Sequence, residues 1–499
     1  MFKNHPKGLI PAALANMGER FGFYIMMAIL TLFLMSKFNL DGEEAGYYYS
    51  IFYCSIYILA LAGGYIADKT KQYKGTIIAG LLVMTLGYAL LAIPALITTK
   101  FIALGALLVI AFGNGLFKGN LQAVVGQLYD DPKYSSRRDA GFQIFYMFIN
   151  IGACIAPFIA VWVRNTFVKM QGFAYNADLP GMCHKFLGGK LTDAKDIDQF
   201  QELATKVSDG VAQTDLTAFA QNYLDAFNTG FHYAFSAAIV AMLISLTIFL
   251  ISKKSLPDPA KKATLATVIS KEEVKQSAQE IKQRILALFA VFGIVIFFWF
   301  SFHQNGLTLT MFAKDYTRLS IGSLELSAEI FQSINPFVVV FLTPVVMWIF
   351  GAMAKRGKEP STPKKIGIGM GIAALAYIVM VVASIGLPNY GDITSSLPDA
   401  ERVTPLVLFS VYFILTVAEL FISPLGLAFV SKVAPAHLQG LMQGCWLGAT
   451  AVGNGALFLG AIMYEQSSLV LTWGVFATVC FISMGVMFCM VKWLEKVAK

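Results

Sequence analysis

The chain has 499 residues, of which 57% are hydrophobic and only 14% are charged. Soluble domains contain about 25% charged residues, so this composition cannot cover a water-facing surface and excludes an ordinary soluble globular protein. The net charge of +8 could indicate nucleic-acid binding, but the basic residues lie in short connections between apolar runs. That placement is typical of the cytoplasmic loops of a membrane protein.

Apolar runs long enough to cross a bilayer recur along the whole chain. A spanning helix needs about 20 mainly apolar residues, and a window of that length predicts two sets of six helices. The first set covers 9–36, 46–67, 74–97, 101–128, 139–165 and 230–252. The second set covers 284–312, 329–353, 364–387, 404–431, 437–463 and 468–494.

The basic residues predict how these helices are oriented. They concentrate in the connections after the second, fourth, sixth, eighth and tenth helices, for example at Lys69, Lys133, Lys355 and Lys432. Cytoplasmic loops are enriched in Lys and Arg, so both termini are expected in the cytoplasm and the protein in the cell membrane.

Two polar segments divide the chain. Residues 166–229 are expected to form an insert outside the cell, either a small cap or a loop, between the fifth and sixth helices. Residues 253–283 form a cytoplasmic linker, where Ser270 and Glu273 fit a helix capping box. The division is therefore an N-terminal six-helix bundle over 1–252, the linker, and a C-terminal six-helix bundle over 284–499. This all-α layout predicts the twelve-helix major facilitator fold, with a substrate site between the bundles near the midplane.

Four of the predicted helices carry residues that lipid does not tolerate. A charge at the bilayer centre costs about 2.5–3.5 kcal/mol on insertion scales, so such residues usually line an aqueous pathway. The first helix has Glu19 and Arg20, the fourth Lys118, the seventh His303, and the tenth Glu419. The alternative is that the charges only pair with one another, as the neighbours on the first helix could do.

The charges of Lys118 and Glu419 indicate the kind of substrate. They lie in opposite halves of the chain, and neither has an opposite charge on its own helix. A basic group in one half and an acidic group in the other suit the carboxylate and amine of a zwitterion. We therefore expect an amino acid or peptide in preference to a sugar.

Several segments carry a family resemblance. The most specific is FQIFYMFINIGA at 142–153, which follows the signature FYxxINxG. GNGLFK at 113–118, FQSINP at 331–336 and ELFISPLG at 419–426 add to it, and GGYIAD at 63–68 is similar to a general facilitator motif. Together they resemble the proton-dependent oligopeptide transporter (POT/PTR2) family of the major facilitator superfamily, outside the insert. The resemblance implies a symporter that imports di- and tripeptides by alternating access, coupled to protons.

The same resemblance implies the substrate contacts of the N-terminal half. Arg20 and Lys118 would face the peptide carboxylate, to which Arg offers a planar, bidentate contact. Tyr24 and Tyr57 match tyrosines that line the pocket. For Tyr57, ordinary packing between helices is an equally good interpretation without the resemblance.

Further contacts are implied for the amine and backbone of the peptide. Asn150, Asn335 and Glu419 would hold these groups, because a carboxylate accepts charge-assisted hydrogen bonds from an ammonium. Trp446 matches an aromatic residue of the pocket wall, again with packing as the alternative.

The chain departs from the family at positions linked to proton coupling and gating. The family pattern ExxERFxYY has its first Glu replaced by Asn16, and an acidic residue of the seventh helix is replaced by His303. The candidates for coupling and gating are then Glu19, Arg20, His303 and Glu419. One hypothesis is coupling rerouted through one of the two Glu or the His, since His titrates near neutral pH. The rivals are an uncoupled carrier and a symporter of another small zwitterion or organic anion.

Other classes find no support in the sequence. It contains no HExxH or GxSxG motif and no metal-spaced His or Cys cluster, so we expect no enzyme activity and no cofactor other than protons. The expected partners are small peptides and the lipid bilayer, without nucleic acid. The chain is expected to be a monomer, and its six Cys show no disulfide framework.

Overall fold

The structure is a computed structural model that describes residues 5–70, 72–129, 131–135, 138–257, 278–321, 324–393, 396–434 and 439–497. Within these residues, 12 helical segments are long and apolar enough to cross a membrane, which confirms the predicted spans and the helical fold class. The described part contains one small antiparallel hairpin, formed by β1 (Ser320–Ile321) and β2 (Leu324–Glu325).

The first six spans pack into one group. They are α1 (Leu9–Phe38), α2 (Gly42–Thr70), α3 (Tyr73–Ala92), α4 (Lys100–Leu128), α6 (Arg138–Met170) and α9 (Leu216–Ser252). Helix α1 packs on α6 and α9, while α4 packs on α2 and α3. The short helix α5 (Pro132–Ser135) lies before α6, and the 3-10 turn η1 (Lys253–Ser255) follows α9.

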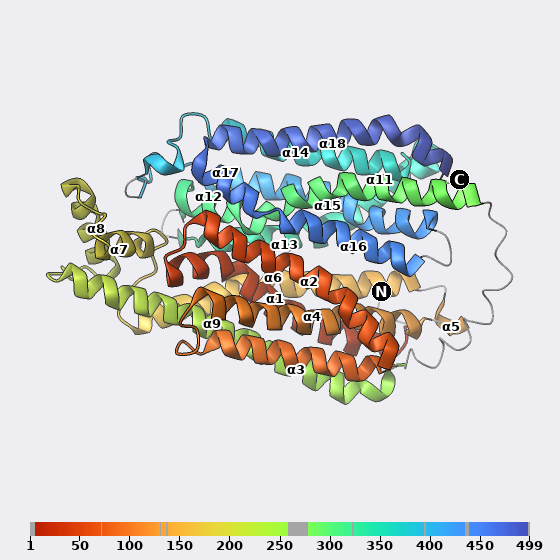
Figure 1. Ribbon diagram of the computed structural model, residues 1–499, viewed down its shortest axis with the longest axis horizontal. Coiled ribbons are helices and arrows are strands. Elements are labelled where there is room, and N and C mark those ends of the chain that lie inside the picture. Colours follow the sequence, from red (N-terminus) through yellow and green to blue (C-terminus); the bar gives the residue numbers. More distant parts are fainter. Residues whose placement is uncertain are drawn as a thin grey trace.

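The remaining spans form a second group beside the first, as Figure 1 shows. They are α11 (Ala278–Phe302), α13 (Ile334–Lys355), α14 (Thr362–Ala383), α15 (Pro405–Val433), α16 (Gln439–Gly455) with α17 (Phe458–Gln466), and α18 (Leu469–Val497). Helix α14 packs on α15 and α18, and α11 packs on α16 and α18. The groups meet where α2 contacts α16 and α17 and where α6 contacts α13.

Two spans that the sequence predicted as continuous helices are broken. After α11, the chain forms the 3-10 helix η2 (His303–Gly306) and then α12 (Thr308–Tyr316), and α16 is separated from α17. The two breaks are neighbours, because the Gln304 Nε2 donates a hydrogen bond of 3.2 Å to the Leu457 carbonyl. The Leu457 carbonyl also accepts a backbone hydrogen bond of 2.9 Å from the Gly460 N–H, and hydrogen bonds of this kind make a helix break tolerable at membrane depth.

The insert is shorter than the predicted 166–229. Helix α6 continues to Met170, and α9 begins at Leu216, where the Asp215 side chain accepts hydrogen bonds from two backbone N–H groups. The insert itself contains α7 (Leu179–Leu187) and α8 (Ala194–Val207). The start of α9 was missed because its first turns are amphipathic: Phe219 packs on Phe173 and Phe200 of the insert.

The insert marks one end of the bundle, which we call the insert end and which lies at the left of Figure 1 with α12 and α17. At the insert end the Glu465 carboxylate accepts hydrogen bonds from the backbone N–H groups of Gly42 and Glu43, at the first turn of α2. A carboxylate at a helix N-terminus is favourable, so α17 caps α2 across the two groups. The predicted capping box at Ser270 and Glu273 lies outside the described residues.

Candidate functional site

Helix α1 carries a closed ion pair. The Arg20 Nε and Nη2 donate to the two oxygens of Glu19 at 2.5 and 2.6 Å, and the Asn114 Nδ2 of α4 donates to Glu19 at 2.7 Å. Glu19 is fully buried, Arg20 nearly so, and the guanidinium lies 4.6 Å from the ring centre of Phe23. The charge of Arg20 is therefore compensated inside the protein, as the pairing alternative expected.

Lys118 is in a different electrostatic position. It lies one turn along α4 from Asn114 and is partly exposed, with its Nζ 4.8 Å from the ring centre of Tyr57. None of the ion pairs in the described part of the chain includes Lys118. A cation over an aromatic ring, without a carboxylate, is available to an anionic group of a ligand.

The second group contributes Glu419 of α15. The Asn335 Nδ2 of α13 donates to Glu419 at 2.8 Å and to the Thr416 hydroxyl at 3.0 Å. Both Glu419 and Asn335 are partly exposed. Among the described residues, the hydrogen-bond partner of this carboxylate is a neutral amide, so it can accept a further hydrogen bond from an ammonium or bind a proton.

Tyrosines connect the two sides of the site. The side chains of Tyr24 and Tyr57 each interact electrostatically with both Arg20 and Glu419. Lys118 is in turn within range of Arg20. The structure thus brings these five predicted residues, which come from α1, α2, α4 and α15, into one site.

One site residue was not singled out in the sequence. Tyr146 of α6 is 47% exposed and lies within electrostatic range of Glu419, Tyr24 and Tyr57. It is the Tyr of the FYxxINxG signature, so the motif already contained the signal. Its phenol adds a hydrogen-bonding group between the basic and acidic sides of the site.

Two predicted residues have mainly structural contacts. The Asn150 Nδ2 donates to the Tyr146 carbonyl of its own helix at 3.0 Å. Trp446 is 2% exposed, packs edge-to-face on Phe292, and lies so close to Gly426 that a Cβ there would overlap the indole. The packing interpretation therefore describes the contacts of Trp446 in this structure.

His303 lies at the first helix break, in an aromatic sandwich. Its ring stacks on Trp299 with centroids 4.9 Å apart and approaches the Tyr53 ring at 4.7 Å. Its Nδ1 is hydrogen-bonded to the Asn454 Oδ1 of α16. No sequence signal pointed to Asn454, because its contact with His303 depends on how α11 and α16 pack.

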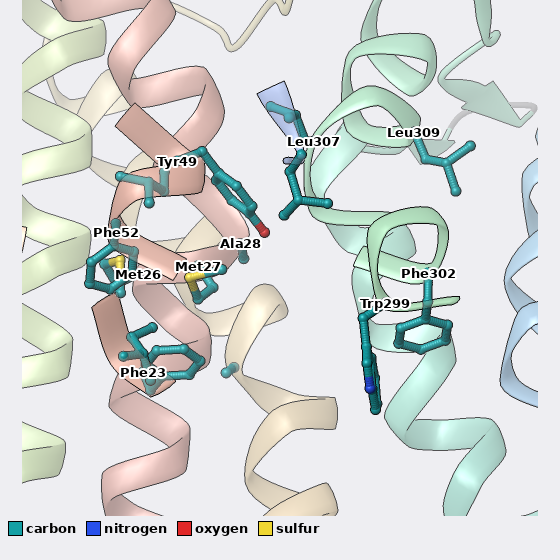
Figure 2. Packing of buried hydrophobic residues seen from close by; sticks show 14 of the residues in the cluster. Phe23, Met26, Met27, Ala28, Tyr49, Phe52, Trp299, Phe302, Leu307 and Leu309 are labelled. Atoms are coloured by element: carbon teal, nitrogen blue, oxygen red, sulfur yellow. The ribbon is translucent and has the colours of Figure 1, made fainter. Parts of the chain in front are cut away.

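Apolar side chains seal the seam between the groups on the insert side of His303. Figure 2 shows the Tyr49 side chain of α2 pointing toward Leu307 of the second group. The Thr31 hydroxyl donates to the Gly306 carbonyl across this seam at 3.0 Å. The packing closes the site toward the insert end.

The structure has two groups of spanning helices. One group carries an uncompensated cation, and the other carries a carboxylate with neutral partners. These features define a multi-pass membrane carrier and not an enzyme. The POT family profile matches residues 74–271 and 257–471. The chain belongs to the POT family, which confirms the resemblance seen in the sequence.

Named relatives and solved structures agree with this assignment. The chain is 30% identical to the peptide transporter YePEPT of Yersinia enterocolitica over 91% of this chain and 87% of that protein. It is 26% identical to dipeptide and tripeptide permease B of Shigella dysenteriae, over 98% and 96% of the two chains. A crystal structure of a peptide transporter POT in complex with sulfate superimposes with a TM-score of 0.74 at 23% identity, covering 100% of this chain and 96% of that one.

Proposed function

We propose that the protein imports di- and tripeptides across the cell membrane by alternating access. The observation that carries the proposal is the pair of opposed charges, Lys118 in the first group and Glu419 in the second. A peptide zwitterion would place its carboxylate at Lys118 and its amine at Glu419. The names of the relatives, a peptide transporter and a di- and tripeptide permease, support this substrate class.

Within this proposal the two basic residues have different roles. Arg20 is bound bidentately by Glu19, so Lys118 is the main anchor for the peptide carboxylate. Arg20 contributes a weaker electrostatic attraction to the same carboxylate. Asn335 orients Glu419, and Tyr24 and Tyr57 line the space between the charges. Asn150 and Trp446 would shape the walls.

Proton coupling is assigned to Glu419. Protonation of Glu19 would break its ion pair with Arg20, whereas protonation of Glu419 disturbs only neutral partners. His303 is already bound to Asn454 between two aromatic rings, which makes it the weaker candidate. One proton carried with a neutral zwitterion moves one charge, which contributes about 2.3 kcal/mol per 100 mV of membrane potential.

The proposal includes the organisation of the chain. The bundle over 1–252 and the bundle over 284–499 would rock around the site, with 253–283 as the cytoplasmic linker and the insert end outside the cell. The basic loops support cytoplasmic termini. We propose a monomer as the transporting unit.

The test is uptake of labelled dialanine into proteoliposomes, with and without an imposed proton gradient and membrane potential. Gradient-dependent accumulation is expected, and Glu419→Gln should abolish accumulation while His303→Gln retains it. The matched control is Glu44→Gln, a carboxyl on the exposed side of α2 that pairs with Lys100. Equilibration without accumulation would make the protein an uncoupled carrier, and no dialanine movement would overturn the peptide proposal.

A further inference from the structure

Three exposed lysines lie together at the end of the bundle opposite the insert. Helix α14 begins there and α18 ends there, because the Lys364 Nζ lies 3.0 Å from the Glu495 Oε1. Figure 1 shows this end at the right, beside the C-terminus, with α7 and α8 at the opposite end. Lys492 and Lys496 are exposed on the last turns of α18. We call Lys364, Lys492 and Lys496 the lysine edge.

The lysine edge continues faces of α14 and α18 that point toward lipid. Phe488 of α18 is 43% exposed, and Lys492 and Lys496 follow it at intervals of four residues, on the same face of the helix. Leu375 of α14 is 52% exposed and lies about three turns after Lys364 on one face. Exposed apolar side chains of a spanning helix contact lipid tails, and lysines near helix ends reach the headgroups. The ammonium groups are therefore placed at the headgroup level, on the lipid side of the helices.

The charges of the lysine edge are only partly compensated. Glu495 pairs with Lys364, whereas neither Lys492 nor Lys496 takes part in any ion pair of the described part of the chain. The neighbouring Lys365 is different, because it is buried, donates to Glu359 and lies 4.2 Å from the ring centre of Phe350. The excess positive charge thus belongs to the exposed lysines and is available to an anion from outside the chain.

The connection between α13 and α14 extends the same basic surface. Lys355, Arg356 and Lys358 are all exposed, and no ion pair of the described residues includes them. Trp348 of α13 is 73% exposed and lies two turns before Lys355 on one face. Exposed Trp side chains are typical of the boundary between lipid tails and headgroups. The position of Trp348 therefore supports a headgroup level for the basic residues that follow it.

The simplest alternative is that these lysines only orient the helices in the membrane. That role depends on the number of basic residues in a loop and not on the helix face that carries them. It does not account for Lys492 and Lys496, which lie within α18 in line with its lipid-facing side chains. Their alignment with Lys364 across the contact between α14 and α18 favours a ligand that is itself part of the bilayer.

We propose that the lysine edge binds the phosphate headgroup of an anionic phospholipid, whose acyl chains lie along the exposed faces of α14 and α18. Lysine ammonium groups bind phosphate as point charges and can share its oxygens. A lipid with an additional ammonium in its headgroup is neutral overall and gains less from the same surface. In the orientation proposed above, this lipid belongs to the cytoplasmic leaflet, and its binding does not depend on the peptide proposal.

The test is native mass spectrometry of the full-length protein in an uncharged detergent, with phosphatidylglycerol or with phosphatidylcholine of the same acyl chains. The wild-type protein should bind phosphatidylglycerol at least about tenfold more tightly. Lys364→Gln, Lys492→Gln and Lys496→Gln together should weaken this binding about ten- to hundredfold and leave phosphatidylcholine binding unchanged.

The matched control removes three exposed lysines of the first group, by Lys133→Gln, Lys253→Gln and Lys254→Gln, and should retain most of the binding. Glu495→Gln removes the competing carboxylate and should tighten phosphatidylglycerol binding about fivefold; unchanged binding would contradict the role of Lys364.

Equal affinity for the two lipids, or an equal loss in the control variant, would overturn the proposal. Displacement of phosphatidylglycerol by millimolar inorganic phosphate would assign the lysine edge to a soluble anion and would overturn the lipid. No peptide is present in these measurements, so their failure is distinguishable from a failure of dialanine uptake.

Discussion

Replacement of Lys118 and of Arg20 by Gln should have opposite consequences, although both residues are basic and belong to the same site. In the part of the chain that the structure describes, Lys118 lies over the Tyr57 ring and takes part in no ion pair, whereas Arg20 is held by Glu19 through two hydrogen bonds. Lys118→Gln removes a charge that the folded protein does not need. Arg20→Gln leaves the carboxylate of Glu19 buried, with Asn114 as its remaining donor.

The magnitudes follow from these surroundings. A hydrogen bond to a charged group contributes about 1.5–3 kcal/mol, so Lys118→Gln should weaken dialanine binding roughly ten- to hundredfold with little loss of stability. Removal of one partner of a buried ion pair costs about 3–5 kcal/mol, so Arg20→Gln should mainly destabilise the fold. Arg20→Gln paired with Glu19→Gln should recover much of that stability.

The assay is ligand-dependent thermal unfolding of the purified protein, with dialanine and with dialanine amide, which lacks the carboxylate. Wild-type protein should prefer dialanine strongly, and Lys118→Gln should bind both ligands equally weakly. Dialanine binding by Lys118→Gln at wild-type affinity would refute the assignment of Lys118 as the carboxylate anchor. So would a loss of affinity in Arg20→Gln without any loss of stability.

Three further predictions concern packing and the insert. A Cβ at Gly426 would meet the Trp446 ring at 1.9 Å, so Gly426→Ala should lower stability by about 1–3 kcal/mol, and Trp446→Phe should restore part of it; equal melting temperatures would contradict this. Burial raises the pKa of Asp178 despite its 2.6 Å ion pair with Arg402. Its folded pKa exceeds the unfolded value, so stability falls as pH rises from about 4 through the raised pKa, and Asp178→Asn should flatten that fall in melting curves. Burial raises the pKa of the Cys183 thiol to about 12, so it should react with maleimide at pH 7 only after unfolding; rapid labelling of the folded protein would disprove the burial.

Helix positions could be predicted because membrane spans depend on length and composition, which a single sequence contains. The breaks could not, because a window of about 20 residues averages the short polar stretch from His303 to Gly306 with the apolar residues on either side of it. The Gln304 contact with the Leu457 carbonyl, which brings the two breaks together, exists only once α11 and α17 have packed. The early start of α9 was missed for a related reason, since Phe219 is buried by the insert and not by lipid.

The charged residues differ in the same way, because some could be predicted from the sequence and others could not. Lys118 and Glu419 stand out in the sequence because charges in the middle of apolar spans have few structural explanations. Arg164 and Glu329, which form a second fully buried ion pair, do not, because they lie at the ends of predicted spans, where charged residues normally face water. Their burial results from the contact between α6 and the 3-10 helix η3 (Ala328–Ser333) and from cover by Tyr175 of the insert. A charge at a helix end gives no sign of burial until the neighbouring group of helices is placed.

Helix geometry predicts that Asn16, where the family pattern has a Glu, faces Lys118. Consecutive spans alternate in direction, so α1 and α4, which are in contact, run antiparallel. The Glu19 carboxylate on α1 accepts a hydrogen bond from Asn114 on α4. One helical turn further from the insert end, the residues at the same level are Asn16 on α1 and Lys118 on α4. Asn16→Glu should therefore place a carboxylate beside Lys118 and weaken dialanine binding about tenfold by competing with the peptide carboxylate, whereas Asn16→Gln should bind as wild type. Wild-type affinity in Asn16→Glu would mean that the two residues do not meet.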